Sequence, residues 1–312
     1  MLLRFSLGST ISSNAVPQDL KKAMMPVRQT LSLPDIQLSY LEWKQGKEPL
    51  LLLHGLADHA LVWLSLGDSL ADRYHIVAPD MRGHGESSKP DRGYTFADAI
   101  ADLEALMAHL GWSSVHVVGH SWTGKVALIW ARQHPERLRS MILVDPIFVW
   151  KMPSPLKVTF PILYRLLPFL QGMGPFASYE QAIRQARRLN LYEGWSSLQQ
   201  QVFQGGIEQK PNGRWGSKFV IPARNQIFEE VMRVAGFTDP IDIPTLFIQP
   251  KKGVNRTDWQ LKPYKTYLGN LIICKVSGNH WPFLVEPEKF NQTVQAFLQG
   301  QREHGSTPEA QF

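Results

Sequence analysis

One short segment of this chain constrains its fold more than any other. The apolar, β-branched residues Val115, Val117 and Val118 lead directly into Gly119-His120-Ser121, and Lys125–His134 has the residue pattern of a helix. A serine in a sharp turn between a strand and a helix has its hydroxyl raised above the sheet, and the helix N-terminus behind it presents unpaired backbone N–H groups. The segment therefore predicts a nucleophilic serine, Ser121, where a strand ends.

The rest of the sequence alternates between short apolar strands and helical patterns. Phe96–Leu110, for example, repeats its apolar residues at the spacing of one helical face. Short apolar strands separated by helices predict a parallel sheet that is covered on both faces and binds ligands beyond the carboxyl ends of its strands. The predicted strands are Ile36–Trp43, Leu50–Leu53, His75–Ala78, Val115–Val118, Met141–Val144, Thr245–Ile248 and Leu271–Val276.

This alternation stops between Pro146 and Pro240, where helical patterns dominate and Asn212-Gly213 is typical of a turn between short extended pieces. We predict a core made of residues 28–146 and 241–300, with residues 147–240 inserted as a cap. Residues 1–27 are expected to form a loosely attached extension and residues 301–312 a flexible tail. The helices predicted in the cap are Leu156–Leu170, Tyr179–Leu189, Trp195–Phe203 and Gln226–Val234.

Composition narrows the class of protein. The net charge of +6 comes from scattered basic residues, and no interleaved basic and aromatic stripe predicts nucleic-acid binding. Contact of a positive surface with a membrane surface stays open as an alternative, although no apolar run approaches the roughly 18 residues that span a bilayer. The single cysteine, Cys274, excludes an internal disulfide, lies in an apolar run that predicts burial, and fits a cytoplasmic location.

Four motifs follow one another in an order and spacing typical of a known family. They are Leu51–Gly55, Asp80–Ser87, Gly119–Trp122, and Ser277–Pro282 followed by Glu286–Phe290. On these motifs the chain resembles the α/β-hydrolase fold superfamily from about Leu31 to Leu298. The resemblance implies an α/β fold with a mostly parallel sheet of the eight-stranded type, helices on both faces and an inserted helical cap.

The resemblance and the chemistry of serine together indicate the candidate site residues. A serine hydroxyl needs a base within hydrogen-bond reach, and His280 is the predicted base because it follows the last predicted strand on a glycine-bearing loop. The backbone N–H groups of Leu56 and Trp122 are predicted to form the oxyanion hole. His120 is expected to point away from the pocket and to serve only in packing.

A third residue, an acid, is needed to orient His280 and complete a Ser-His-acid triad, and the sequence leaves open which residue this is. The family usually places an acid after the penultimate strand, and that position is Gly253 here. Asp145, one strand inward, is one alternative acid, because neighbouring strands lie about 4.8 Å apart and some dehalogenases of the superfamily use an acid there. Asp258 folding back is another, although it equally suits a helix N-cap. The third alternative is that no acid is present.

Two further features bear on activity. Thr123 stands where the family motif has glycine, and its branched side chain is expected to crowd the turn. The predicted cap begins with large apolar residues from Phe148 to Leu170, which favour an apolar substrate. No metal-ligand cluster or phosphate-binding glycine loop is recognisable, and we expect no cofactor and no metal.

The sequence thus predicts a cofactor-independent serine hydrolase of small hydrophobic esters, acting through an acyl-enzyme on Ser121. A carbon–carbon bond hydrolase and a ligand-binding member with weak or no catalysis remain alternatives. Dehalogenase and epoxide hydrolase chemistry are disfavoured, because the nucleophile in those members of the superfamily is an aspartate.

Overall fold

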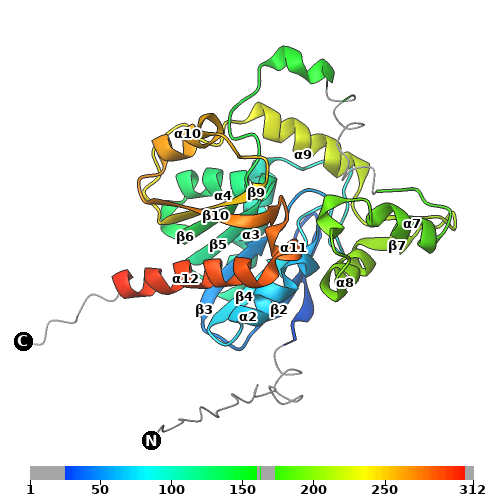
Figure 1. The fold of residues 1–312 in the computed structure, drawn as a ribbon, viewed down its shortest axis with the longest axis horizontal. Helices are drawn as coiled ribbons and strands as arrows, with labels where there is room; N and C mark the ends of the chain where they lie inside the picture. Colours follow the sequence, from blue (N-terminus) through cyan, green and yellow to red (C-terminus); the bar gives the residue numbers. More distant parts are fainter. Residues whose placement is uncertain (1–24, 160–161, 163–172, 306–312) are drawn as a thin grey trace, which may run out of the picture.

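The computed structural model describes residues 25–159, 162 and 173–305. Its centre is an eight-stranded sheet in the order β1-β2-β4-β3-β5-β6-β9-β10 (Figure 1). β1 and β2 pair with each other antiparallel, β2 pairs antiparallel with β4, and every later pair is parallel. The strands are β1 Val27–Ser32, β2 Gln37–Trp43, β3 Glu48–Leu53, β4 Tyr74–Pro79, β5 Val115–His120, β6 Leu138–Val144, β9 Thr245–Lys252 and β10 Leu271–Asn279.

The sheet is buried on both faces because its central strands direct apolar side chains toward both of them. In β3, Leu51 and Leu53 face one hydrophobic cluster while Leu50 and Leu52 face the other. The first cluster includes residues of α3, α4 and α10, and the second includes residues of α2, α11 and α12. These helices are α2 Leu64–Leu70, α3 Phe96–Leu110, α4 Trp122–Gln133, α10 Asp258–Tyr267, α11 Pro282–Val285 and α12 Pro287–Gly305. The predicted fold class is confirmed.

Three details at the margins of the sheet differ from the sequence prediction. Strand β1 is not among the predicted strands, because this edge strand is largely exposed and lacks an apolar face. Cys274 is only partly buried, because β10 lies at the other edge of the sheet. Helix α12 continues to Gly305, so the predicted tail begins within a helix.

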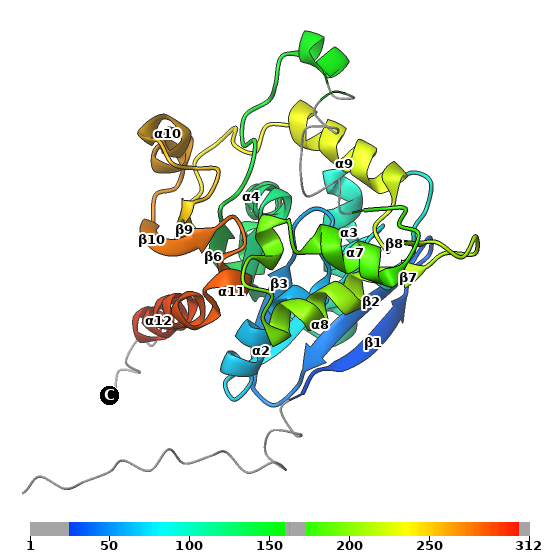
Figure 2. The same cartoon turned by 45° about the vertical axis from the view of Figure 1, so that its right-hand side comes forward.

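The segment between β6 and β9 carries mostly helices, which lie together beside the sheet in Figures 1 and 2. The predicted turn at Asn212-Gly213 is present between two short antiparallel strands, and Gly213 adopts φ 77° there. Most of the predicted helix Leu156–Leu170 lies outside the described residues, and the bounds 147–240 of the cap remain our proposal. The elements are η3 Ser154–Thr159, α7 Tyr179–Ala186, η4 Asn190–Tyr192, α8 Ser197–Gly206, β7 Ile207–Gln209, β8 Trp215–Ser217 and α9 Ile221–Arg233.

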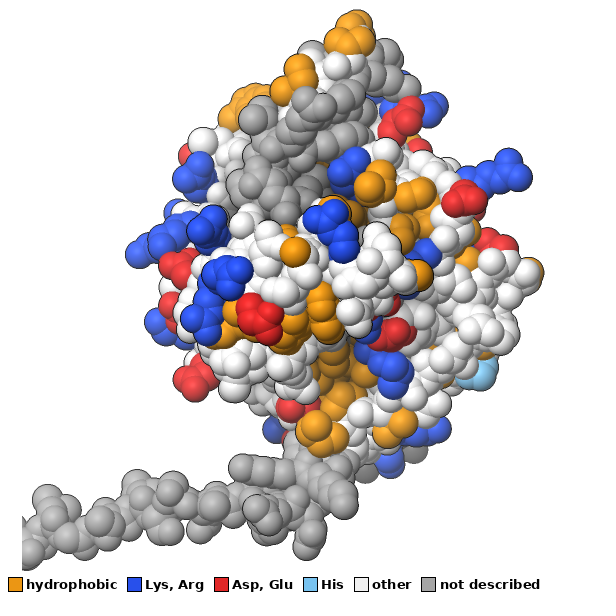
Figure 3. All heavy atoms as spheres, turned by 90° about the vertical axis from the view of Figure 1, so that its right-hand side faces the viewer, with side chains coloured by type: hydrophobic (Ala, Val, Ile, Leu, Met, Phe, Trp, Pro, Cys, Tyr) orange, Lys and Arg blue, Asp and Glu red, His pale blue; other side chains and the backbone are white. Residues whose placement is uncertain are grey.

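Figure 3 shows how basic side chains are distributed over one face of the molecule. On the face shown in Figure 3, lysines and arginines lie among acidic and neutral side chains and form no continuous stripe. In the described part of the chain, no helix combines the length and the apolar character that crossing a membrane requires.

A buried lysine joins the helix behind Ser121 to the cap. The Lys125 side chain is fully buried, and its Nζ donates hydrogen bonds of 2.6 Å to the carbonyl oxygens of Phe148 and Val231. Burial lowers the pKa of Lys125 to about 7, and the Glu230 carboxylate offsets this effect only in part. This lysine therefore connects α4 to α9 at the cost of an unfavourable environment for its charge.

We expect Lys125→Met to remove a pH dependence of stability. From about pH 7 to the ordinary lysine pKa of 10.5, the unfolded chain holds a proton on this side chain that the folded chain has lost. The free energy of unfolding therefore rises with pH across this window, by about 1.4 kcal/mol per pH unit. Chemical denaturation at several pH values measures this slope, with the exposed Lys44→Met as the control. An unchanged slope in Lys125→Met would contradict the prediction.

Candidate active site

Ser121 occupies a strained turn between β5 and α4. Its backbone adopts φ 59° and ψ −118°, a conformation that non-glycine residues rarely take. The turn is compact, since a Cβ on Gly119 would lie 2.8 Å from the carbonyl oxygen of Thr123 and a Cβ on Gly124 would lie 2.9 Å from Cβ of Pro146. The two glycines around the turn therefore allow the strand, the helix and the start of the cap to approach closely.

Thr123 does not crowd the turn as the sequence analysis expected. Its side chain is buried, and Oγ1 lies 2.9 Å from the carbonyl oxygens of Leu53 and His120. The hydroxyl thus connects the turn to the end of β3. The close approach that the family motif assigns to a glycine at this position is made here by Gly124 instead.

Asp145 lies beside His280. The residue follows β6 with φ 42°, is fully buried, and its Oδ2 accepts a 2.6 Å hydrogen bond from Nδ1 of His280. Oδ2 also accepts from the backbone N–H of Val254 at 2.8 Å, and Oδ1 accepts from the backbone N and Nδ2 of Asn255 at 3.1 and 3.0 Å. The carboxylate is therefore held on both oxygens and aimed at one nitrogen of the imidazole.

These contacts determine the charge of Asp145. Burial by itself raises the pKa of this carboxyl group, but the hydrogen bond and charge of His280, with the donors of Val254 and Asn255, outweigh burial and hold the pKa below its ordinary value. Asp145 is thus an anion at neutral pH, and it can orient an imidazole and stabilise the positive charge that develops on it.

The other candidate positions for the acid lie differently. Gly253 borders Asp145 directly, because a Cβ at Gly253 would stand 2.5 Å from Oδ2 of that carboxylate. Asp258 is almost fully exposed and pairs with Lys265 Nζ at 3.0 Å, so it does not reach the histidine. Its expected role as an N-cap is also wrong, since Thr257 caps α10.

His120 does not point away from the pocket. It lines the same cavity as Ser121, and its Nε2 donates a 2.8 Å hydrogen bond to the carbonyl oxygen of His280. On its other side, Nδ1 lies 3.4 Å from the buried carboxylate of Asp58, which also accepts from Trp281 Nε1 at 3.1 Å. His120 therefore supports the backbone of the histidine loop, a role that sequence reasoning missed.

The predicted oxyanion donors lie on two different elements. Trp122 is the first residue of α4, so its N–H has no acceptor within the helix, and no acceptor for the N–H of Leu56 is found in the described part of the chain. The loop around Leu56 is held by His54, whose Nδ1 donates to the carbonyl oxygen of Gly55 at 2.8 Å and whose Nε2 accepts from Met81 N–H at 2.9 Å. Burial lowers the pKa of His54, which favours this neutral tautomer.

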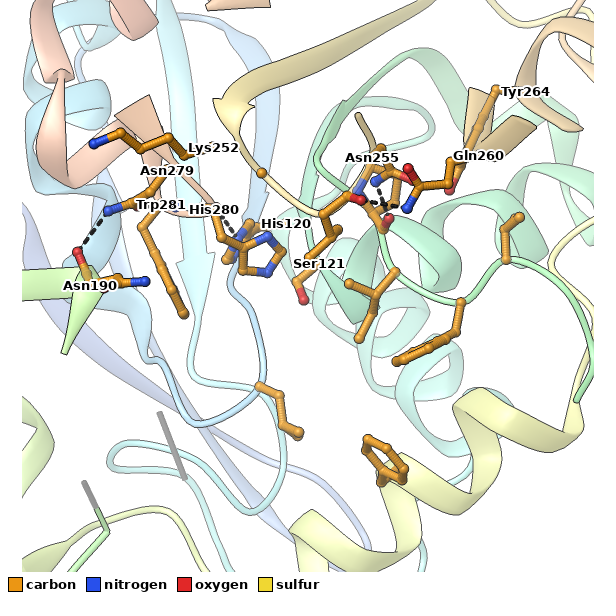
Figure 4. Close-up of a pocket in the computed structure, with 18 of the residues that line it drawn as sticks. His120, Ser121, Asn190, Lys252, Asn255, Gln260, Tyr264, Asn279, His280 and Trp281 are labelled. Atoms are coloured by element: carbon orange, nitrogen blue, oxygen red, sulfur yellow. Dashed lines mark hydrogen bonds between the residues drawn. The ribbon is translucent and has the colours of Figure 1, made fainter. Parts of the chain in front are cut away.

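A cavity of about 720 Å³ opens above these groups. Ser121 and His280 both line it, and Figure 4 shows the imidazole next to the serine side chain. Within the described residues Ser121 Oγ makes no hydrogen bond, and contacts of this kind commonly tighten only when substrate binds. Among the same residues, no group of three or more histidine, cysteine or acidic side chains is arranged to hold a metal ion.

Comparison with known proteins identifies the family of the chain. The chain belongs to the alpha/beta hydrolase fold family, whose model matches residues 48–248. A soluble epoxide hydrolase of Corynebacterium sp. (strain C12) is 35% identical over 99 residues, which are 32% of this chain and 35% of that protein. A fluoroacetate dehalogenase of Burkholderia sp. is 30% identical over 172 residues, 54% of this chain and 55% of that protein. The chain thus matches about a third to about half the length of these curated relatives.

Solved structures share the fold over most of the chain. E-2-(acetamidomethylene)succinate hydrolase has a TM-score of 0.72 at 21% identity, and the match covers 88% of this chain and 99% of that one. A marine microorganism esterase has a TM-score of 0.68 at 23% identity, covering 83% and 98%. At these identities the likeness concerns the fold alone.

Proposed function

We propose that the chain is a cofactor-independent serine hydrolase of carboxylic esters with an apolar acyl group. Ser121 is the nucleophile, His280 the general base and Asp145 the acid that orients it. The observation that carries the proposal is the 2.6 Å hydrogen bond between Asp145 and Nδ1 of His280 beside a serine in a strained strand–helix turn.

The reaction follows from the roles of these groups. With Nδ1 donating to Asp145, Nε2 of His280 takes the proton of Ser121 as Oγ attacks the ester carbonyl. The N–H groups of Leu56 and Trp122 stabilise the oxyanion of the tetrahedral intermediate. His280 then gives the proton to the leaving alcohol, and a water molecule, deprotonated by the same imidazole, cleaves the acyl-enzyme and regenerates Ser121.

The nucleophile itself favours acyl transfer over the chemistry named for the curated relatives. Opening an epoxide or displacing a halide with a serine oxygen would leave an alkyl ether on Ser121, which a histidine-activated water does not hydrolyse. An acyl ester on Ser121 is hydrolysed by that water. Serine at position 121 therefore supports ester hydrolysis rather than epoxide or carbon–halogen cleavage.

Labelling with a fluorophosphonate tests the proposal. We expect one covalent adduct on the intact protein and none on Ser121→Ala, because only an activated serine displaces fluoride from phosphorus. The Ser121→Ala variant should also lower hydrolysis of a soluble short-chain ester about 10⁶-fold. Intact-mass spectrometry and ester turnover provide the measurements. A folded protein that gains no adduct would refute the proposal and favour a ligand-binding role.

A further inference from the structure

The cavity has two chemically different sides. Of the described residues that line it, none is acidic, while Arg188 and Lys252 bring two cationic side chains to it. In Figure 4, Lys252, Asn279 and Asn190 lie together on one side of Ser121 and His280. This group, with Arg188, is called the polar side below.

Contacts between three separate chain segments assemble the polar side. Asn279 Nδ2 donates to the carbonyl oxygen of Asn190 at 2.8 Å, which joins the end of β10 to η4. Lys252, at the end of β9, lies 3.7 Å from a carboxylate oxygen of Glu193. Arg188 lies two residues before Asn190 on the same cap segment. Lys252 therefore stands at the carboxyl end of β9, and Arg188 lines the same cavity from the cap segment that Asn279 contacts.

Neither cation is neutralised by a strong ion pair. The side chains of Lys252 and Glu193 are 73% and 57% exposed, and at such exposure a pair 3.7 Å apart is weak and readily exchanged. Arg188 is exposed and, within the described ranges, forms no ion pair with an acidic side chain. Asn279 Nδ2 also donates to Glu193 Oε2 at 3.1 Å, so an anionic ligand that binds Lys252 replaces the exposed Glu193 carboxylate there, whereas Arg188 has no such competitor among the described residues.

Apolar side chains form another wall of the cavity. Phe148, Val149 and Met152 come from the start of the cap, and Phe228 comes from α9. The rings of Phe148 and Phe228 meet edge to face with their centroids 6.2 Å apart. Polar side chains at the edge of this wall are already engaged, since Asn255 Nδ2 donates to Asp145 and to the carbonyl oxygen of Pro146. This wall suits an acyl chain.

The chemistry of the proposed reaction decides which part of the substrate meets which side. The imidazole of His280 must deliver its proton to the leaving group, so the leaving group departs on the side of the histidine. Asn279 precedes His280 directly and belongs to the polar side. The leaving group therefore faces the two cations, and the acyl chain faces the apolar wall.

We propose that the substrate is an amphipathic ester whose leaving alcohol carries an anionic group, a carboxylate or a phosphate, bound by Arg188 and Lys252. This inference rests on the proposed ester hydrolase function and adds the charge and orientation of the substrate. Arg188 and Lys252 act as specificity-determining residues and take no part in bond making.

Three esters with one hexanoyl chain test the proposal. The leaving group is 4-hydroxybenzoate in the first, 4-hydroxyphenyl phosphate in the second and the neutral 4-hydroxybenzamide in the third. We expect kcat/KM to be about tenfold higher for at least one anionic ester than for the neutral ester, and the preference should shrink as salt is added. The comparison of carboxylate with phosphate shows which anion the site prefers.

The variant Arg188→Gln/Lys252→Gln should bring the ratio of anionic to neutral kcat/KM close to one. Lys251→Gln is the matched control, because Lys251 is exposed and does not line the cavity, and it should keep the wild-type ratio. Provided that the neutral ester is hydrolysed, two results would overturn the proposal. One is a wild-type ratio at or below one, and the other is a ratio that the double variant leaves unchanged. If no ester is hydrolysed and no fluorophosphonate adduct forms, the proposed function itself has failed.

Discussion

Replacing Asp145 by asparagine is expected to lower ester turnover about 10⁴-fold with little change in KM. Asparagine preserves the shape of the side chain but presents an amide to Nδ1 of His280, where the wild type presents a carboxylate oxygen at 2.6 Å. In Ser-His-Asp enzymes this exchange imposes the wrong imidazole tautomer, and the loss in turnover is of about this size. The effect should appear in kcat because the acid acts on the transition state.

Steady-state kinetics on a soluble ester measure this loss, and thermal unfolding checks that the variant folds. Asp258→Asn is the matched control, since this carboxylate is exposed and pairs only with Lys265 among the described residues. The control should retain wild-type turnover. If Asp145→Asn retained turnover and Asp258→Asn lost it, the assignment of the acid would be wrong.

Most of the sheet could be predicted from the sequence because its strands are buried on both faces. Continuous apolar runs such as Leu50–Leu53 and Met141–Val144 have few other places in a globular fold. The exposed strand β1 carries no such pattern and went unpredicted. Cys274 shows the same limit, since an apolar run gives no indication of whether its strand lies at the centre or at the edge of a sheet.

Some features of the candidate site could likewise be predicted from the sequence, and others could not. Ser121 and His280 stand in local motifs, so the sequence marks them, and their catalytic roles stay predictions. The contacts of Asn255 with Asp145 and of His120 with the histidine loop join residues more than 100 positions apart. Such contacts depend on strand register and loop path, and no local pattern encodes them. The only sequence feature that pointed to Asp145 was Gly253, a glycine at the position where the family usually has the acid.

The contacts around position 253 explain why this position carries a glycine. A Cβ at this position would lie 2.5, 2.9 and 3.0 Å from Oδ2, Cγ and Oδ1 of Asp145. Positions 145 and 253 thus direct their side chains into one volume, which only one carboxylate can occupy. In Gly253→Ala the added methyl group should displace the carboxylate and lower turnover about 10²-fold, a loss typical of a catalytic group moved by about 1 Å.

The same geometry predicts that the acid can be transferred between the two strands. We expect Asp145→Gly to lose most of its turnover, and Asp145→Gly/Gly253→Asp to regain about 10²-fold, because the aspartate at 253 reaches the volume that the first substitution vacates. Glycine suits position 145, whose φ is 42°.

The single variant Gly253→Asp should instead lose both stability and turnover, since two carboxylates would then share one buried site and one of them would take up a proton. Ester kinetics and thermal unfolding of the four proteins measure this coupling. Additive losses in the double variant would show that 145 and 253 do not serve the same histidine.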